Sequence, residues 1–595
     1  TLFPYTTLFR SMSKGVHVAH NKLEANLQDQ HGQSGHGAIP LSAGMLLVTL
    51  GVVYGDIGTS PMYTMKSIVA NNGGIGTVSE DMILGALSLV IWTMTLVTTV
   101  KYVLIAMRAD NHNEGGIFAL FSLVRKVAPW LILPAMIGGA ALLADGILTP
   151  AVTVTTAIEG LRTIEWGHAL LGDGQTNVII ITIIIICGLF AMQRAGTSSI
   201  GKLFGPLMTL WFLFLAGAGL FNMLGNLSIL RALNPIRGIM FLFSPINHSG
   251  IMVLGFVFLS TTGAEALYSD MGHVGKANIY ASWPFVKAAR ILNYLGQGAW
   301  LLANNSNPQM LAMDIVNPFY MMLPEPLRPF AIVLSAVAAI IASQALITGS
   351  FSLVSEATRL NLMPHLRIHY PSDTKGQLYI PLVNNIMWVG CIFIVLLFQN
   401  SERMESAYGL AITVTMLMTT TLLTSYIAGI LKHKLGACVF ALLFGAIELC
   451  FFASCLTMFF DGGYVMIFLA SLLFGLMYVW RRGTAIERTQ TILLPVSIVC
   501  AMTRPTRCSP TIWCSSPTAP IRSRSTATCS IPSWTSIPSA PRHIGSSTCT
   551  LPTSPIRTSI PSRPLAQTSC SACAWTWALR SISASTPTCA RSLAT

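Results

Sequence analysis

Three acidic side chains inside long apolar stretches are the residues of this chain that could carry chemistry. Asp56, Asp145 and Glu265 each lie within a run of mostly apolar residues. An ionised carboxylate at membrane depth costs about 3 kcal/mol or more, so such residues usually serve a function and have an identifiable partner. Their negative charge favours a cation, and neighbouring hydroxyl and carbonyl oxygens could replace the water around that ion.

Asp56 lies in the segment GVVYGDIGTSPMYTMK, residues 51–66, which three glycines and a proline interrupt. Backbone without helical hydrogen bonds is tolerated inside a membrane only where it lines an enclosed cavity, so this pattern predicts a broken helix at a transport site. The glycines would let backbone carbonyls turn toward an ion. Tyr63 could add a hydroxyl or a ring face. The structural alternatives are a helix cap for Asp56 and packing for Tyr63.

Asp145, Thr149 and Thr153 recur every four residues, so they would line one face of a helix. One carboxylate and two hydroxyls then form a strip of oxygen ligands. Pro150 removes a helical donor and would leave the carbonyl near Gly146 free to face an ion. The structural alternatives are a buried basic partner for Asp145 and hydrogen bonds from the threonines to their own helix.

Thr262 and Glu265 lie beside a second interruption, Thr261-Thr262-Gly263. A carboxyl in a low-dielectric site readily holds a proton and releases it when a cation approaches, so Glu265 is predicted to couple proton and ion. The structural alternative is a protonated acid that is hydrogen-bonded to the broken backbone. Asp270, nearer the expected cytosolic end, is predicted to be a gate or loop contact.

The composition indicates the elements that position these residues. The 595-residue chain is 53% hydrophobic and 10% charged, whereas soluble domains carry roughly 25% charged residues. It is therefore predicted to be an all-α polytopic membrane protein. Runs of about 20 apolar residues predict twelve spans, near 41–68, 83–107, 130–158, 176–193, 203–222, 249–269, 282–303, 328–355, 380–398, 405–430, 436–459 and 462–480.

Charge asymmetry predicts the orientation. With both termini in the cytosol, the inner loops carry twelve Lys and Arg residues and the outer loops five, as the positive-inside rule requires. Interrupted first and sixth spans suit two inverted five-helix repeats with a site at their interface. The first apolar run belongs to the broken helix, so no cleavable signal peptide is expected. Lys101 is expected to snorkel to the inner surface.

Both ends of the chain have unusual sequences. Residues 1–11, TLFPYTTLFRS, resemble a translated sequencing adapter, and residues 12–40 read as a polar cytoplasmic arm. The transporter domain is expected over 41–482, and the start of a cytoplasmic C-terminal region over 483–501.

Residues 502–595 contain no Asp, Glu, Lys, Asn, Val, Phe or Tyr, which is expected of a shifted reading frame. A natural Ser/Pro linker is the alternative. The segment holds nine arginines and no acid, so removing it lowers the formal charge from +13 to about +4. The basic isoelectric point therefore gives no indication of a nucleic-acid partner.

Several motifs together resemble one family, the Kup/HAK/KT potassium uptake transporters. They include the segment 51–66 and four others, MRADNHNEGG from Met107, ADGILTPA from Ala144, GAEALYSDMGHVGK from Gly263 and AYGLAIT from Ala407. The resemblance extends over about residues 41–494. It implies the LeuT-like fold of the amino acid, polyamine and cation transporters, with two extra helices at the C-terminal end.

The resemblance also implies a site. Its potassium ligands would be Asp56, Tyr63, Asp145, Thr149, Thr153 and Thr262, with Glu265 in proton coupling. Tyr408, in AYGLAIT, would be a gate or ion neighbour, and an interfacial aromatic is the alternative. Many family members have Glu at the Asp145 position, which leaves the ion number and affinity there open.

The leading functional hypothesis is potassium uptake as K⁺/H⁺ symport by alternating access across a bacterial inner (plasma) membrane. One charge moving down roughly 100 mV releases about 2.3 kcal/mol, and a co-transported proton doubles this to about 4.6 kcal/mol. Each tenfold concentration ratio costs about 1.36 kcal/mol. The potassium accumulation that the membrane potential can hold therefore rises from roughly 50-fold without the proton to roughly 1,000-fold with it.

The alternative function is an amino acid or polyamine carrier of the same fold. Asp56 and Asp145 disfavour an amino acid carrier, because such carriers rarely need two acids in the site. A channel-like or sensing subunit is a third class. No enzymatic activity and no cofactor are expected, and no P-loop indicates ATP use. The expected partners are potassium, protons and the lipid bilayer, without nucleic acid, and a homodimer is left open.

Overall fold

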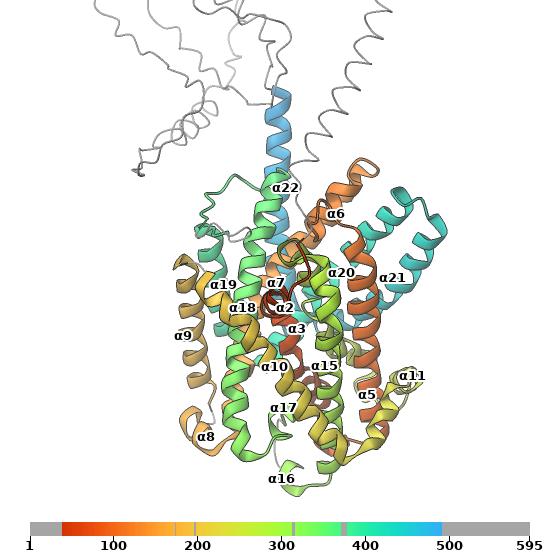
Figure 1. Ribbon diagram of the computed structural model, residues 1–595, viewed down its shortest axis with the longest axis vertical. Coiled ribbons are helices and arrows are strands. Elements are labelled where there is room, and N and C mark those ends of the chain that lie inside the picture. Colours follow the sequence, from red (N-terminus) through yellow and green to blue (C-terminus); the bar gives the residue numbers. More distant parts are fainter. Residues whose placement is uncertain (1–38, 173, 196–197, 312–315, 371–377, 491–595) are drawn as a thin grey trace, which may run out of the picture. The chain divides into compact units, whose positions relative to one another are not determined.

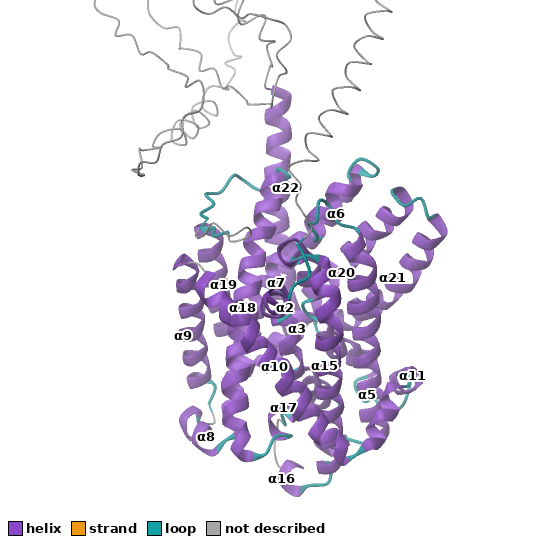
Figure 2. Cartoon of the chain, viewed as in Figure 1, coloured by secondary structure: helices purple, strands orange, loops and turns teal. Residues whose placement is uncertain are grey.

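The computed structural model describes residues 39–490 except 173, 196–197, 312–315 and 371–377. Within these residues the chain is helical, and the only β-structure described consists of two isolated bridges (Figure 2). The predictions for residues 1–11, for the arm as far as residue 38, and for 491–595 lie outside the described residues. An all-α architecture is confirmed for the described part.

The principal helices, in chain order, are α2 (Ala43–Val52), α3 (Gly55–Thr59), α4 (Thr64–Asn71), α5 (Glu80–Thr93), α6 (Ile117–Val124), α7 (Ile132–Glu159), α8 (Glu165–Leu171), α9 (Thr176–Met192), α10 (Ser198–Gly225), α11 (Pro235–Leu242), α12 (Val253–Phe258), α13 (Ala264–Ser269), α15 (Lys276–Asn304), α18 (Arg328–Arg359), α19 (Pro381–Phe398), α20 (Ser401–Gly429), α21 (Lys434–Thr457) and α22 (Tyr464–Gln490). A π-helical segment, Met94–Ile105, continues α5.

Nine helical stretches among the described residues are long and apolar enough to cross a membrane. These are Glu80–Arg108, Pro129–Thr163, Leu203–Gly225, Gly250–Ser269, Glu325–Arg359, Pro381–Phe398, Ser401–Gly429, Lys434–Thr457 and Phe459–Thr489. Two bent pairs, α2 with Gly55–Asn71 and α8 with α9, raise the number to eleven if each pair is one span. The remaining predicted span, 282–303, is the seventh in chain order and corresponds to α15, which carries Lys276, Lys287 and Arg290 in its N-terminal half and is not among these stretches. The count of twelve stays a prediction.

The first predicted interruption is confirmed. The chain bends by 66° between α2 and the helical stretch that begins at Gly55. The glycines here allow close packing: a Cβ atom on Gly51 would lie 2.6 Å from the Gly205 nitrogen, and one on Gly55 would lie 2.8 Å from the Ala342 Cα. Only a residue without a side chain permits this contact, so α2 and α3 lie directly against α10 and α18.

The second interruption, between α12 and α13, is built differently. Thr262 is extended, with φ −52° and ψ 145°, and Gly263 has a left-handed φ of +81°. This backbone conformation favours glycine. A Cβ atom on Gly263 would also lie 2.7 Å from Ile57 Cγ1 and 3.0 Å from Asp56 Oδ2. The two breaks therefore touch each other, although about 200 residues separate them in the sequence.

Long helices surround the two breaks. The helix α7 packs along α18 and α20, and α10 packs along α15 and α2. In Figure 1, α2, α3 and α7 lie in the middle of the helices, with α9 and α19 on the left and α5 and α21 on the right. Polar groups exposed at the breaks thus lie in the interior, where a bound ion would be shielded from lipid.

Candidate functional site

Asp56 is the first acid of the candidate site. It lies in the first turn of α3, and its side chain is only 4% exposed. The Tyr408 hydroxyl, from α20, donates to the Asp56 carboxylate, 3.2 Å from Oδ1 and 3.3 Å from Oδ2. The same hydroxyl accepts a hydrogen bond of 3.0 Å from Thr149 on α7. Tyr408 therefore joins three helices at one point, and its side chain is fully buried.

Asp145 lies one turn from Thr149 on α7 and is equally buried. The Thr149 hydroxyl lies 3.5 Å from Asp145 Oδ1 and 3.1 Å from the Asp145 carbonyl oxygen. The Thr153 hydroxyl donates to the Thr149 carbonyl at 2.8 Å. The predicted strip of oxygens is therefore present, although each threonine also bonds its own helix. Asp145 forms no ion pair with a described residue, so a basic partner for it is not found there.

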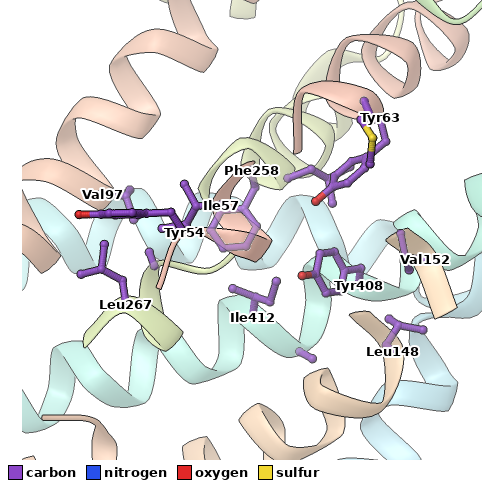
Figure 3. Packing of buried hydrophobic residues seen from close by; sticks show 14 of the residues in the cluster. Tyr54, Ile57, Tyr63, Val97, Leu148, Val152, Phe258, Leu267, Tyr408 and Ile412 are labelled. Atoms are coloured by element: carbon purple, nitrogen blue, oxygen red, sulfur yellow. The ribbon is translucent and has the colours of Figure 1, made fainter. Parts of the chain in front are cut away.

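Tyr63 and Thr262 connect the two breaks. Their hydroxyl oxygens lie 3.2 Å apart, and both side chains are buried. Figure 3 shows the rings of Tyr63 and Tyr408 near each other with their hydroxyls on the same side. The structure therefore brings hydroxyls from the first span, the sixth span and α20 into one region around Asp56.

Glu265 lies in the first turn of α13, next to the second break. One carboxylate oxygen, Oε1, accepts a hydrogen bond from the Tyr102 hydroxyl. The other, Oε2, is buried and has no hydrogen-bond partner among the described residues. A cavity of about 10 Å³ is lined by Glu265 and by Asp145, together with Gly263 and Thr415. Such a cavity is about the size that one water requires.

A larger cavity begins at Asp56. Its volume is about 30 Å³, and its lining includes Val53, Ala266, Asp270 and Gly349. Asp270, predicted as a gate or loop contact, thus lies on the same cavity as the proposed ion ligand. The cavity extends from the ion site along α13 and α18.

Arg290 is a buried residue near the site that the sequence reading missed. It lies on α15 and is fully buried. Its Nη2 donates to the Ser60 hydroxyl at 2.7 Å and to the Ser260 carbonyl at 2.5 Å. Ser60 lies in the 3₁₀ turn after α3, and Ser260 lies in the 3₁₀ turn that leads into the second break, so Arg290 ties the first and sixth spans together. It is also close enough to Asp56 to interact electrostatically. Its position as the one arginine inside the predicted span 282–303 could have indicated a buried functional or structural role.

Lys101 was predicted wrongly. It is fully buried, and its Nζ lies 2.5 Å from Glu448 Oε1 on α21. It does not snorkel because its ammonium group is satisfied inside the protein, by the Glu448 carboxylate, the Tyr102 hydroxyl and the Met416 carbonyl. Glu448, also buried, was not identified from the sequence.

A second buried ionic cluster joins α4, α7 and α20. Lys66 Nζ lies 3.3 Å from Glu159 and 4.0 Å from Glu405, and it donates to Ser401 Oγ at 2.8 Å. Ser67 Oγ donates to Glu405 at 2.5 Å. The sequence reading did not anticipate this cluster, because its members are far apart in the chain.

A family model described as K⁺ potassium transporter integral membrane domain matches residues 43–485. The chain belongs to this potassium transporter family. The matched region contains every residue of the candidate site described above. The family resemblance inferred from the motifs is thereby confirmed.

Bacterial relatives in the family are similar over most of the chain. A probable potassium transport system protein Kup 1 of Lactococcus lactis is 58% identical over 438 residues, which are 73% of this chain and 65% of the relative. A probable Kup 2 of Bifidobacterium longum is 54% identical over 446 residues, 75% of this chain and 60% of the relative. A probable potassium transport system protein Kup of Latilactobacillus sakei is 55% identical over 451 residues, which are 76% of this chain and 66% of the relative. The chain thus matches 60–66% of the length of these relatives.

Solved structures give a weaker likeness. A manganese transporter of Eremococcus coleocola in complex with an aromatic bis-isothiourea compound is 13% identical, with a TM-score of 0.43, over 76% of this chain and 97% of that one. MhsT in complex with L-phenylalanine is 13% identical, with a TM-score of 0.40, over 72% of this chain and 100% of that one. A likeness at this level does not establish a shared fold or substrate.

Proposed function

We propose that this chain takes up potassium across the plasma membrane as a secondary transporter. The observation that carries this proposal is the meeting of two buried carboxylates, Asp56 and Asp145, with the hydroxyls of Thr149 and Tyr408. Neither acid forms an ion pair with a described residue, so both remain available to a mobile cation. Membership of a potassium transporter family supports potassium as that cation.

Potassium sites in proteins replace the water around the ion with oxygen atoms. The proposed ligands, Asp56, Tyr63, Asp145, Thr149, Thr153 and Thr262, supply only oxygens. Thr153 and Thr149 donate their hydrogens to helix carbonyls or to Tyr408, which leaves their lone pairs free for an ion. Tyr408 is proposed to close the site, because its hydroxyl contacts both Asp56 and Thr149.

The proposed architecture is a pair of inverted five-helix repeats with α21 and α22 added. Broken first and sixth spans that touch at Gly263 and Ile57 support this architecture, because transporters with inverted repeats hold their substrates at such breaks. Both termini are proposed to lie in the cytosol of a bacterial cell. Alternating access would then expose the same buried site to each side of the membrane in turn.

Symport with a proton is proposed to use Glu265. Glu265 lines the small cavity that Asp145 also lines, and one of its carboxylate oxygens has no hydrogen-bond partner among the described residues. A cation at Asp145 and a proton on Glu265 would therefore affect each other across this cavity. A neutral amide in place of the acid, as in Glu265→Gln, would resemble the protonated form. We expect that variant to retain potassium binding, to lose potassium-dependent proton entry, and to accumulate potassium only to the uniport limit.

The test uses the purified chain in lipid vesicles at a fixed membrane potential. Rubidium uptake, competed by potassium, measures cation transport, and a pH dye inside the vesicles reports proton entry. Competition by spermidine or by amino acids, without competition by potassium, would replace this proposal by the carrier alternative. Proton entry at the wild-type ratio in the Gln variant would remove Glu265 from coupling and leave Asp145 as the next candidate.

A further inference from the structure

The two carboxylate oxygens of Glu265 have different surroundings. Oε2 is buried without a hydrogen-bond partner among the described residues, and Glu265 lines the cavity shared with Asp145. Oε1 accepts a hydrogen bond from the Tyr102 hydroxyl. The groups that fix the position of the Tyr102 hydroxyl would therefore influence proton exchange at the Glu265 carboxyl.

Tyr102 is held by a buried ion pair. Lys101 Nζ lies 3.1 Å from the Tyr102 hydroxyl oxygen, 2.5 Å from Glu448 Oε1 and 3.1 Å from the Met416 carbonyl oxygen. Thr420 donates to the other Glu448 oxygen at 2.7 Å. The three lysine hydrogens thus have three acceptors, and both oxygens of Glu448 are bonded.

The direction of these hydrogen bonds follows from the groups themselves. An ammonium group has donors and no acceptor, so Lys101 must donate to the Tyr102 oxygen. The Tyr102 hydrogen is then free to point at Glu265. A hydrogen bond donated to a carboxyl in this way favours its ionised form. The ion pair therefore fixes both the place and the polarity of the hydroxyl that contacts Glu265.

The burial of the Lys101–Glu448 ion pair is not by itself evidence that the pair stabilises the fold. Lys101 is 0% exposed and Glu448 is 1% exposed. Replacing such a pair by apolar residues of similar volume is often neutral or stabilising, because both charges must be desolvated. Its place beside Tyr102 and Glu265 gives it another use.

We propose that Lys101 and Glu448, acting through the Tyr102 hydroxyl, position Glu265 for proton exchange with the cavity. This inference rests on the proposed function of Glu265 as the coupling acid. It assigns to α21, which lies outside the proposed ten-helix core, a part in coupling. Lys101, Glu448 and Tyr102 are positioning residues, since in the described part of the chain none of them forms a hydrogen bond or an ion pair with a proposed ion ligand.

Several groups besides Tyr102 face Glu265 and contribute to its titration. They are Lys101 from the π-helical segment, Thr419 from α20, Glu448 from α21, Asp145 from α7 across the small cavity, and Tyr268 from its own helix. The experiment therefore compares variants that change the Tyr102 contact alone with variants that change the ion pair.

The experiment measures potassium-dependent proton entry into vesicles against pH, with the full chain and saturating potassium. Tyr102→Phe removes the hydroxyl and keeps the ring. We expect an alkaline shift of about one pH unit in the midpoint of proton-coupled transport, which is the effect of losing one hydrogen bond to a carboxylate. Tyr280→Phe, at an exposed tyrosine of α15, is the matched control and should leave the midpoint unchanged.

A double variant, Lys101→Met with Glu448→Leu, removes both charges together and so avoids leaving one of them buried alone. We expect an alkaline shift of the same sign, because the Tyr102 hydrogen is no longer directed at Glu265. The matched control is Lys276→Met with Asp110→Leu, which removes a more exposed pair. If either test variant fails to reach the membrane, the midpoint of the other decides the inference.

The outcomes separate this inference from the function on which it rests. Coupled wild-type transport that Glu265→Gln abolishes, together with shifted midpoints in the test variants, supports both. Coupled wild-type transport with unshifted midpoints in the test variants overturns this inference alone. Wild-type vesicles that take up rubidium without protons overturn the coupling proposal and this inference with it.

Discussion

The Tyr408 hydroxyl lies 3.2 Å from Asp56 Oδ1 and accepts a 3.0 Å hydrogen bond from Thr149. One phenol group thus connects the first turn of α3 to the face of α7 that carries Asp145 and Thr149. A cation that binds between Asp56 and Asp145 must compete with, or join, these two bonds. Uptake should therefore depend on the groups around this phenol in a graded way that single substitutions can measure.

The two acids should be the least replaceable residues. Asp56→Asn and Asp145→Asn keep the size of the side chain and remove its charge, so each should lower rubidium uptake at least tenfold, while the protein still reaches the membrane. Asp461→Asn, at an exposed acid, is the matched control. Uptake at the wild-type rate in both site variants would return the acids to structural roles.

The two threonines of α7 should differ. Thr149 bonds Tyr408 as well as its own helix, whereas the Thr153 hydroxyl has a described bond only to the Thr149 carbonyl. Thr149→Ala should therefore raise the potassium concentration for half-maximal uptake several-fold, because the loss of one hydrogen bond costs about 1 kcal/mol. Thr153→Ala should raise it less. The opposite order in a rubidium uptake titration would contradict the assigned contact with Tyr408.

Gly263 should tolerate no side chain. Gly263→Ala combines a left-handed φ with a Cβ atom 2.7 Å from Ile57, so it should destabilise the protein by more than about 1 kcal/mol and abolish uptake. Gly445→Ala provides the control, because a Cβ atom there meets nothing within 4 Å. Thermal unfolding of the detergent-solubilised proteins checks the difference, and equal melting temperatures would refute it.

Removal of the cation from the Lys66 cluster should destabilise the protein strongly. Lys66→Met leaves Glu159 and Glu405 together without their cation, and breaking a buried pair in this way costs about 3–5 kcal/mol. Lys276→Met, at a more exposed pair, should cost about 0–1 kcal/mol. Denaturation in detergent would show the contrast, and similar losses for both variants would mean that the Lys66 cluster is not the stronger of the two.

Local chemistry explains which features could be predicted from the sequence. The two breaks were predictable because Gly, Pro and acidic residues interrupt apolar runs at fixed places. The strip of Asp145, Thr149 and Thr153 was predictable because a helix has a known period. In both cases neighbouring residues carry the whole signal.

Pairing between distant segments could not be predicted. Lys101 and Glu448 are 347 residues apart, and Ser67 and Glu405 are 338 apart. Periodicity and composition show that a charge lies in a span, but only the packing of α21 against α20 and its neighbours shows which opposite charge meets it.

Arg290 limits how the segments around Ser60 and Ser260 can move relative to each other. Because one guanidinium nitrogen bonds both Ser60 and Ser260, the segments cannot separate without giving up a charged hydrogen bond inside the protein. A conformational change that keeps these bonds must carry both segments, and the ion ligands attached to them, as one rigid unit. The ligands on these segments, Asp56, Tyr63 and Thr262, would then keep their relative positions during the change of access, whereas Asp145, Thr149 and Thr153 belong to α7 and could move against them.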